Sequence, residues 1–290
     1  MDDTSAHSRR SWLLAWIIGL LVLVLAIGLA LWRISAGATS KPVDLSKLYW
    51  VFYKEDLTRM NASDPALIKQ LLAGPGVYAY VQSNGYPPLP AGAIPVENFQ
   101  SNAALQAAVA NHKILPGVPW VADDPEYWPA TPVPEQQDPL PFMQAFAKTA
   151  TTQGLKTILV PGRDLMLVPG ATCGQKQGQT ISQAYVSCGL PGVSAYAPIY
   201  VIQGAAIETD LPALTQLAQT ASAAARQANP NAIVIVTLAS APGGGSPVGY
   251  NVLNRAARAV LPYVQGFELN STPTTDSRMI SFLHALSSGS

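Results

Sequence analysis

Short apolar runs alternate with longer amphipathic stretches along most of this chain. Seven such runs are four to nine residues long and rich in Val, Ile, Tyr and other residues that favour strands; they cover residues 48–53, 76–82, 114–122, 157–160, 196–203, 232–238 and 264–269. Because apolar residues fill these runs almost continuously, the pattern predicts strands whose two faces are both buried.

Helices are predicted between these strands. Apolar residues recur there at helical spacing, in stretches that cover residues 65–72, 102–111, 139–152, 211–227, 248–261 and 276–286. Asp64, Asp138 and Asp210 stand directly before three of these helices. A carboxylate at this position can accept hydrogen bonds from the free N–H groups of the first turn, so we expect all three aspartates to act as N-caps.

Strands separated by helices form β-α units, and the strands of such units run parallel in one sheet. Seven strands of this kind, with no Gly-x-Gly-x-x-Gly turn, favour an α/β fold of the TIM type, a (β/α)8-like barrel that is irregular or incomplete at one strand. An open, doubly wound sheet is the alternative. The sequence shows no internal repeat and no second domain.

Residues 12–32 form a different pattern, because they are apolar throughout and carry no charge. About 20 apolar residues, at a rise of about 1.5 Å each, span the hydrocarbon core of a bilayer. Trp12, Trp16 and Trp32 stand near the ends of the segment, where amphipathic rings favour the membrane interface. We therefore expect a transmembrane anchor at residues 12–33, with the membrane as a partner of the chain.

The charges around this segment predict its orientation. Arg9 and Arg10 precede it and favour a cytoplasmic N-terminus, although Arg33 and Lys41 on the far side reduce the charge difference. The alternative is a signal sequence cleaved near Ala38, which would lead to secretion. In both cases the rest of the chain lies outside the cytoplasm. The expected order is a cytoplasmic segment at residues 1–11, the anchor, a linker at residues 34–47 and an extracytoplasmic barrel domain at residues 48–290.

Cys173 and Cys188 lie in a long predicted loop, residues 163–191, with no histidine nearby. Structural zinc sites take four Cys or His ligands, so two cysteines alone do not predict one. Outside the cytoplasm a disulfide is favoured over two free thiols. A bond that closes a loop of this length would stabilise the fold by about 3 kcal/mol.

The charge balance argues against several classes of function. The chain has 17 basic and 17 acidic side chains, so no basic surface for nucleic acid is expected. The Gly-Lys-Ser/Thr loop that holds nucleotide phosphates is missing from the sequence. His7, His112 and His284 are far apart in the predicted fold, which argues against a Ser-His-Asp triad or a histidine metal site. We expect no nucleotide, no metal and no cofactor.

Polar residues cluster where the predicted strands end. In TIM-type barrels the carboxyl ends of the strands form the working face. The candidates that follow strand ends in this chain are Gln82, Asp123, Asp124, Glu126, Arg163, Gln203, Glu268 and Asn270. Tyr127 and Trp128 come directly after the three acids of the third strand, in the stretch VADDPEYWPATPVPEQQDP of residues 121–139.

Two carboxyl groups that face each other across such a mouth can hydrolyse a glycosidic bond, because one protonates the leaving oxygen and the other attacks or activates water. The pair that we expect is Glu268 with either Asp124 or Glu126. The remaining candidates are expected to bind the ligand, with the aromatic rings stacking on a sugar: Tyr127, Trp128, Gln82, Gln203, Asn270, Asp123 and Arg163.

Structural roles for the same residues are the alternative. Asp124-Pro125-Glu126 is also typical of a turn that carries helix caps. Glu268 falls within an apolar strand, where an acid costs free energy unless it is paired. A buried ion pair with Arg163 or Arg255 would explain it without any function.

The stretch after the third strand also carries a motif. It reads D-P-E-x-W-x-x-T-P-x-x-E-Q-x-D-P at residues 124–139, and Pro161-Gly162-x-x-Leu165 follows the next helix. In these motifs the chain resembles a group of uncharacterised exported bacterial proteins with a glycosidase-like barrel. The resemblance extends over residues 76–270, Gln203 and Asn229-Pro230 included. It implies a barrel and an extracytoplasmic location, and it implies no particular activity.

Two hypotheses follow from the sequence. The first is a membrane-anchored, glycoside hydrolase-like barrel that acts on or binds a glycan of the envelope or the exterior. The second is a non-catalytic barrel of the cell envelope that binds a ligand or serves as a scaffold. The separation and the burial of the candidate carboxyl groups distinguish the two, because hydrolysis needs a facing pair that a sugar can reach.

Overall fold

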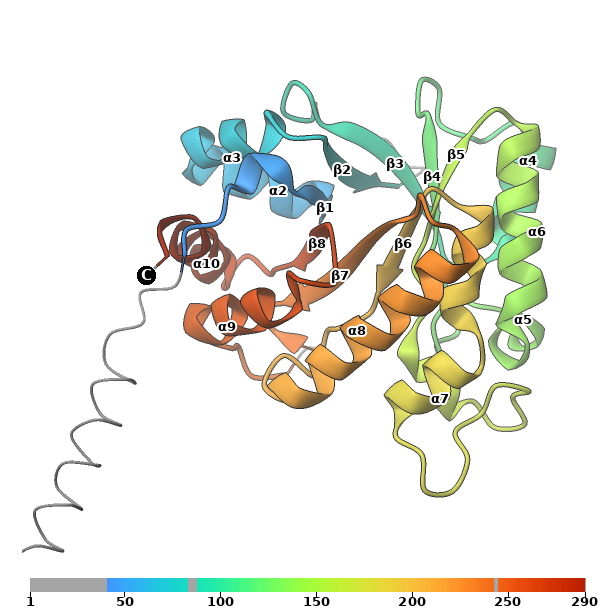
Figure 1. Cartoon of the computed structure of the whole chain (residues 1–290). Coiled ribbons are helices and arrows are strands. Elements are labelled where there is room, and N and C mark those ends of the chain that lie inside the picture. Colours follow the sequence, from blue (N-terminus) through green and yellow to red (C-terminus); the bar gives the residue numbers. More distant parts are fainter. Residues whose placement is uncertain (1–40, 83–87, 243–244, 290) are drawn as a thin grey trace, which may run out of the picture. The chain divides into compact units, whose positions relative to one another are not determined.

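The computed structural model contains eight parallel strands that close into a barrel (Figure 1). Each strand pairs with the next one in sequence, and the last pairs with the first. The strands are β1 (Tyr49–Tyr53), β2 (Gly76–Val81), β3 (Ile94–Phe99), β4 (Trp120–Asp123), β5 (Lys156–Leu159), β6 (Ile199–Ile202), β7 (Ile233–Ala239) and β8 (Gly266–Asn270). The TIM-type prediction is confirmed, and the open doubly wound alternative is wrong.

The structure describes residues 41–82, 88–242 and 245–289. The expected cytoplasmic segment, the anchor at residues 12–33 and the cleavage position near Ala38 all lie outside these ranges. Among the described residues, no helix combines the length and the apolar character that a membrane crossing requires. Val43–Ser288 form one compact unit. Leu45 is fully buried in it, so the last residues of the expected linker belong to the barrel unit.

The strand that the sequence pattern misses is β3, with the sequence IPVENF. Glu97 and Asn98 interrupt its apolar pattern, but each has a distant partner. The Glu97 carboxylate accepts a hydrogen bond from the Leu115 backbone N–H at 2.9 Å. Asn98 faces the barrel interior and donates a hydrogen bond to the Asp124 carboxylate at 3.4 Å. The predicted strand at residues 114–122 is correspondingly too long: β4 begins only at Trp120, after a stretch in which Gly117 has a φ of 76°.

Helices surround the barrel (Figure 1). They are α2 (Lys54–Ser63), α3 (Pro65–Leu72), α4 (Asn102–Ala110), α5 (Val133–Gln137), α6 (Pro139–Thr152), α7 (Ile181–Ser187), α8 (Leu211–Ala228), α9 (Tyr250–Val260) and α10 (Asp276–Ser288), with the 3-10 helices η1 (Leu45–Lys47), η2 (Arg163–Leu167) and η3 (Leu190–Tyr196). The pattern did not predict α2, α5 or α7. α5 and α7 are shorter than the other helices, and α2 carries polar residues on most of its surface.

Two of the three predicted N-caps are confirmed. Asp64 and Asp210 accept hydrogen bonds from backbone N–H groups in the first turns of α3 and α8. The prediction for Asp138 is wrong. Its side chain makes no capping hydrogen bond to α6 and instead accepts one from the Thr172 hydroxyl at 3.2 Å. The short helix α5 ends directly before Asp138, so this residue forms the bend between two helices rather than a free helix start.

The barrel has two apolar cores because side chains alternate between the two faces of each strand. One core fills the interior of the barrel and includes Tyr78, Trp120 and Ile235. The other lies between the strands and the helices and includes Trp50 and Phe146. This alternation decides which polar residues face the mouth of the barrel and which face the helices.

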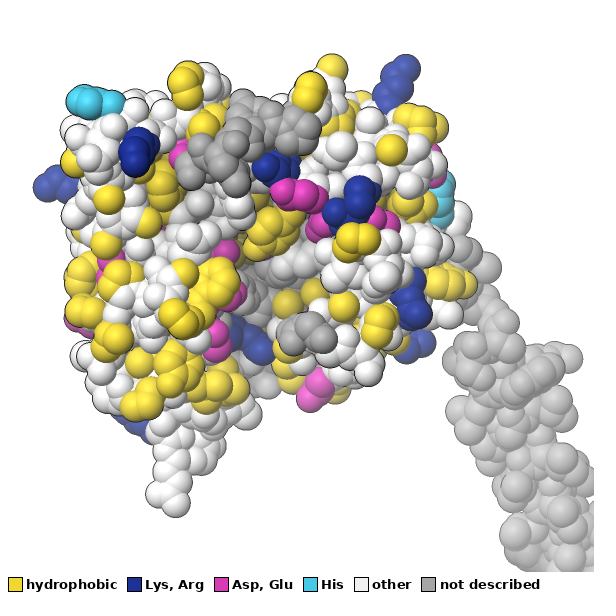
Figure 2. Space-filling view, turned by 180° about the vertical axis from the view of Figure 1, so that it is seen from behind, with side chains coloured by type: hydrophobic (Ala, Val, Ile, Leu, Met, Phe, Trp, Pro, Cys, Tyr) yellow, Lys and Arg dark blue, Asp and Glu magenta, His cyan; other side chains and the backbone are white. Residues whose placement is uncertain are grey.

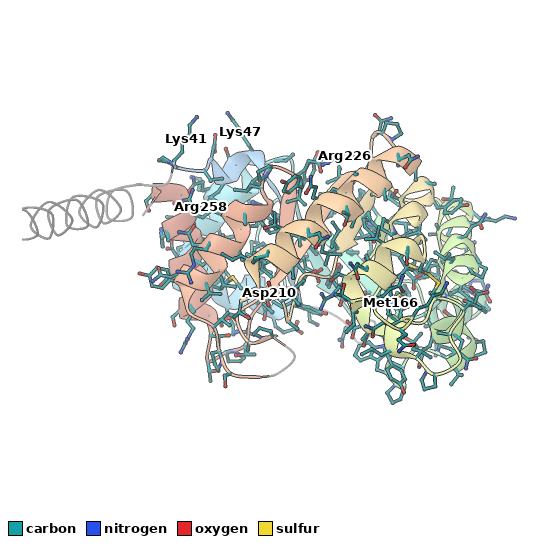
Figure 3. All side chains as sticks on the ribbon, turned by 60° about the horizontal axis from the view of Figure 1, so that its bottom comes forward. Lys41, Lys47, Met166, Asp210, Arg226 and Arg258 are labelled. Carbon is teal, nitrogen blue, oxygen red and sulfur yellow. A yellow bond between two sulfur atoms is a disulfide. The ribbon has the colours of Figure 1, made fainter. Side chains whose placement is uncertain are left out.

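Long side chains fasten the outer helices to one another and to the barrel. Arg226 of α8 donates to the Tyr263 carbonyl at 2.8 Å, and Arg258 of α9 donates to the Leu286 carbonyl at 3.0 Å (Figure 3). Cys173 and Cys188 form a disulfide, with 5.1 Å between their Cα atoms. This confirms the predicted pairing and joins the loop after η2 to the end of α7.

Candidate active site

The carboxyl end of the barrel is lined by polar side chains that continue the inward-facing rows. Two residues past an interior core residue, the side chain again points inward. Asp124 follows Ala122 in this way, and Gln203 follows Val201. The inward-facing residues at this level are Tyr53, Tyr80, Asn98, Asp124, Gln203, Thr237 and Glu268. The space-filling view shows a hollow in one face of the molecule with acidic side chains at its edge (Figure 2).

Gln203 joins two carboxyl groups in this layer. Its Nε2 donates to Oδ1 of Asp124 at 3.4 Å and to Oε1 of Glu126 at 2.9 Å. Because both bonds start from one nitrogen atom, Oδ1 of Asp124 and Oε1 of Glu126 cannot be farther apart than the two bond lengths together. Asn98 donates to the second oxygen of Asp124 at 3.4 Å. Asp124 is buried and Glu126 is partly exposed, so Glu126 is the carboxyl nearer to solvent.

Burial and mutual repulsion favour the protonated forms of these two acids. Burial, together with the charges of Glu126 and Glu268, raises the pKa of Asp124 well above its ordinary value. Burial also raises the pKa of Glu126; the hydrogen bond from Gln203 opposes the shift, and the charge of Asp164 adds to it. The layer can therefore hold a carboxylic acid and a carboxylate side by side, which acid–base chemistry requires.

Glu268 lies deeper, on β8, and is 3% exposed. The Thr237 hydroxyl donates to its Oε2 at 2.7 Å. None of the ion pairs among the described residues includes Glu268, so the alternative of a buried pair with Arg163 or Arg255 is wrong. Burial raises the pKa of Glu268 to about 7, the bond from Thr237 opposes this shift, and the charge of Glu126 adds to it.

Two tyrosines complete the interior layer. The rings of Tyr53 and Tyr80 meet edge to face, with 5.4 Å between their centroids. Burial, reinforced by the charges of Asp124 and Glu268, raises the pKa of both hydroxyls well above 10, so both remain neutral. The Tyr80 hydroxyl is buried and has no hydrogen-bond partner among the described residues. It is therefore available as a donor inside the barrel.

Asp164 extends the acid cluster, and sequence reasoning did not select it. Its Oδ2 accepts a hydrogen bond from the Tyr127 backbone N–H at 3.1 Å. A Cβ atom on Gly162 would lie 2.4 Å from the Asp164 carboxylate and 3.0 Å from Cγ of Glu126. The two acids thus approach each other over a glycine that leaves them room. The cluster does not have the arrangement of a metal site, since no group of three potential ligands gathers suitably within the described ranges.

Two predicted ligand-binding residues do not face the mouth. Asp123 points the other way, toward Phe99 and Val121 of the outer core, and is 1% exposed. Burial and the charges of Glu135 and Asp124 raise its pKa well above the ordinary value. Arg163 points between α7 and α8, where it donates to the Ser182 hydroxyl at 3.4 Å. Asp123 is the last residue of β4, and the alternation of side chains along this strand turns it outward. Arg163 instead begins the 3-10 helix η2, beyond the end of β5.

The other predicted residues lie on the rim. Tyr127 and Trp128 are 46% and 37% exposed, and the Trp128 indole donates to the Thr131 hydroxyl at 2.9 Å, which fixes the ring. Gln82 is exposed at the end of β2 and shares a groove with Asn98. Asn270 closes β8 above Glu268, and its side-chain oxygen is buried without a partner among the described residues.

Five residues of the site were not predicted: Tyr53, Tyr80, Asn98, Asp164 and Thr237. A signal exists for most of them, because they stand at even spacing from interior residues on the same strand. That signal becomes readable only when the strand and its inward face are known. For Asp164 we find no sequence signal beyond its place after a strand.

Comparisons with known proteins leave the chain without a family. No protein-family model matches it, and no curated protein does. Solved structures do resemble it. One of them is bee venom hyaluronidase in complex with a hyaluronic acid tetramer, with 9% sequence identity, a TM-score of 0.49, and coverage of 82% of this chain and 95% of that one.

Proposed function

We propose that this protein is a glycoside hydrolase whose barrel lies outside the cytoplasm and whose N-terminal segment anchors it in the membrane. The observation that carries the proposal is the pair Asp124 and Glu126, held together by Gln203 at the barrel mouth. It replaces the expected pair of Glu268 with one of these acids, because Glu268 lies deeper and is 3% exposed. Facing carboxyl groups are the apparatus by which most glycosidases work. A glycan of the envelope or the exterior is the substrate that this location provides.

The burial of the two acids suggests their roles. Glu126 is the more exposed, and its raised pKa favours the protonated form, so it is placed to protonate the leaving oxygen. Asp124 is deeper and accepts hydrogen bonds from two amides. Burial and the charges of Glu126 and Glu268 raise its pKa well above the ordinary value, and the hydrogen bond from Asn98 opposes this shift. The proposal therefore gives Asp124 the carboxylate role in the state in which Glu126 and Glu268 both hold a proton, where it would face the positive charge that develops on the sugar ring. Glu268 titrates near neutral pH and sets how much negative charge the layer holds.

The separation of the pair supports one stereochemical outcome. Inverting enzymes place their carboxyl groups about 6.5–9.5 Å apart so that water fits between them, whereas retaining enzymes use about 5 Å. The shared bond to Gln203, with arms of 3.4 and 2.9 Å, keeps the nearest oxygens of Asp124 and Glu126 below the inverting range. We therefore propose hydrolysis with retention of the anomeric configuration. Asp124 would attack the anomeric carbon while Glu126 gives its proton to the leaving oxygen, and water, deprotonated by Glu126, would then displace Asp124 from the sugar.

The rim aromatics supply the sugar contact in this proposal. Sugar rings expose C–H faces that pack on aromatic rings, and Tyr127 and Trp128 are among the most exposed large apolar side chains in the described part of the molecule. They lie within two residues of Glu126. A glycan stacked on them would therefore lie beside the proposed proton donor.

The test is turnover on a panel of glycans by the full-length chain. We expect hydrolysis by the wild type and a loss of at least about 100-fold with Glu126→Gln or Asp124→Asn. Asp44→Asn is the matched control, since Asp44 is an exposed acid that precedes β1 at the other end of the barrel. Glycan binding without turnover would refute the enzyme and support the non-catalytic barrel instead.

The location needs a separate measurement. A reporter fused to the C-terminus that is active only outside the cytoplasm should be active and should stay with the membrane fraction. Deletion of residues 12–33 should abolish both properties. A reporter that is inactive in the full-length chain would contradict the proposed orientation.

A further inference from the structure

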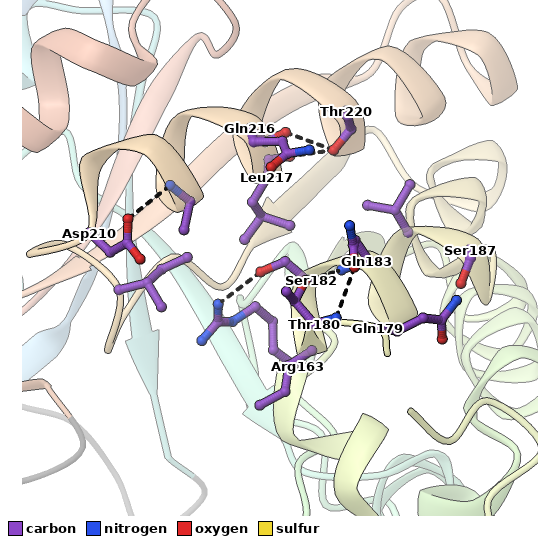
Figure 4. Close-up of a pocket in the computed structure, with 14 residues that line it drawn as sticks. Arg163, Gln179, Thr180, Ser182, Gln183, Ser187, Asp210, Gln216, Leu217 and Thr220 are labelled. Carbon is purple, nitrogen blue, oxygen red and sulfur yellow. Dashed lines mark hydrogen bonds between the residues drawn. The ribbon is translucent and has the colours of Figure 1, made fainter. Parts of the chain in front are cut away.

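A pocket of about 710 Å³ lies outside the barrel, between α7 and the first half of α8 (Figure 4). Its volume is within the range of small-molecule sites, about 300–1,000 Å³. The disulfide at Cys188 fastens the end of α7, one of its walls. Gly162 and Asp164 face Glu126, whereas Arg163 between them points into the pocket. The chain at Gly162–Asp164 thus separates this pocket from the barrel mouth.

Arg163 brings a positive charge into this pocket, and no carboxylate in the described part of the chain forms an ion pair with it. Its one hydrogen bond to a described residue is the long contact of 3.4 Å to the Ser182 hydroxyl. None of the ion pairs among the described residues includes it. A guanidinium group has five N–H donors in a fork that matches a carboxylate. Most of these donors therefore have no protein acceptor among the described residues, and Arg163 lines the pocket.

Two buried acids lie near Arg163 without forming an ion pair with it. Burial lowers the pKa of Arg163, and the charges of Tyr185, Glu208 and Asp164 oppose this shift. One oxygen of Glu208 and one of Asp164 accept a backbone N–H, from Ala239 and Tyr127 respectively, and the other oxygen of each is buried without a partner among the described residues. Asp210 also lines the pocket, and its carboxylate caps α8. Glu208 and Asp164 thus counteract the effect of burial on the arginine without accepting a hydrogen bond from it.

The remaining walls of the pocket are largely apolar. Ile181 and Val186 contribute from α7, Ile207 from the loop after β6, and Leu217 from α8. Arg163 and Leu217 point into the pocket from opposite walls (Figure 4). An inorganic anion or a small polar acid would use the charge but leave this apolar surface exposed to water. A ligand with both a charge and an apolar body would use both parts of the pocket.

We propose that this pocket binds a small organic monoanion, with a carboxylate on Arg163 and an apolar body against Ile181, Val186 and Leu217. The site is independent of the barrel mouth and of the chemistry proposed there. It stands on the open guanidinium, the apolar walls and the size of the cavity.

The probe is 3-phenylpropanoate, titrated calorimetrically into the full-length chain in lipid nanodiscs, with empty nanodiscs subtracted. We expect it to bind, and we expect the uncharged 3-phenylpropan-1-ol to bind at least tenfold more weakly. Glucuronate has the charge without the apolar body and should give no binding. Equal affinity for acid and alcohol, glucuronate binding as strong as that of the probe, or no binding of the probe up to millimolar concentration would each overturn the proposal.

Variants locate the binding. Arg163→Met should weaken 3-phenylpropanoate at least tenfold and leave the alcohol unchanged. Ala213→Trp keeps the charge but fills the pocket, and it should abolish binding of both compounds, so the proposal stays testable even if the arginine variant does not fold. Arg255→Met is the matched control, because Arg255 is exposed on α9, and it should bind like the wild type. Unchanged binding in Ala213→Trp would place the ligand elsewhere and refute the site.

Discussion

Glu268→Gln should make the barrel more stable at alkaline pH and change it little at acid pH. Burial raises the pKa of Glu268 from an ordinary 4.5 to about 7 in the folded protein. The folded state therefore binds this proton more tightly than the unfolded state does, so ionisation destabilises the fold as the pH rises from 4.5 to about 7. At about 1.4 kcal/mol per pKa unit, the full cost above pH 7 is about 3 kcal/mol.

Glutamine keeps the shape of the protonated acid and cannot ionise, so it removes this cost. Thermal unfolding of the full-length chain should show a midpoint about 6–12 °C above that of the wild type at pH 8.5, at about 2–4 °C per kcal/mol for a domain of this size. At pH 4.5 the two midpoints should nearly coincide.

The exposed residue Glu55 supplies the control. Its side chain is 55% exposed, so Glu55→Gln should shift the midpoint little at either pH. A difference between Glu268→Gln and the wild type that stays constant from pH 4.5 to 8.5 would refute the reasoning, because a burial cost of ionisation must depend on pH. A variant that is less stable at pH 8.5 would show that the ionised carboxylate is stabilised by a contact we have missed.

Three further predictions concern the surroundings of the site. Asp164→Asn removes a negative charge beside Glu126 and should therefore lower the pKa of Glu126. The alkaline limb of the pH profile of kcat/KM should then move to lower pH. A limb that does not move would contradict the electrostatic coupling of the two acids. Gly162→Ala places a Cβ 2.4 Å from the Asp164 carboxylate and should cost about 1–3 kcal/mol of unfolding free energy in chemical denaturation, whereas Gly192→Ala, which meets no atom within 4 Å, should cost less than about 0.5 kcal/mol. Cys173→Ser opens a loop of 15 residues and should lower the unfolding free energy by about 3 kcal/mol. Reducing agent should destabilise the wild type by the same amount and should have no further effect on the variant.

Local patterns predicted the strands that are apolar throughout and the helices that have clear caps. They missed β3 because its polar residues are stabilised by contacts that are distant in sequence. Asn98 bonds to Asp124, which directly follows the next strand, and Glu97 bonds to the segment that precedes that strand. A pattern read along one segment cannot contain such partners. The same applies to the last residues of the expected linker, where Leu45 becomes core only through the barrel.

For the candidate site, the sequence does not show which side chains of a strand point into the barrel and which point toward the helices. Asp123 and Asp124 are adjacent, equally acidic and equally close to a strand end, yet one faces the helices and the other faces the mouth. The choice depends on which of Trp120 and Val121 points inward, and both are apolar. Arg163 and Asp164 are also adjacent and point in different directions, but within the 3-10 helix η2 rather than along a strand. The acids Asp124, Glu126 and Glu268 were found because strand ends gather at one end of a barrel, whichever way the side chains point.

The most direct test of the proposed function compares Glu126→Gln with the wild type on two kinds of substrate. If Glu126 protonates the leaving oxygen, the variant should lose at least about 100-fold in kcat/KM on an unactivated glycan and far less on an aryl glycoside of the same sugar, whose phenolate leaves with little protonation. Equal losses on both substrates, or no loss on either, would contradict the assignment of Glu126 as the proton donor.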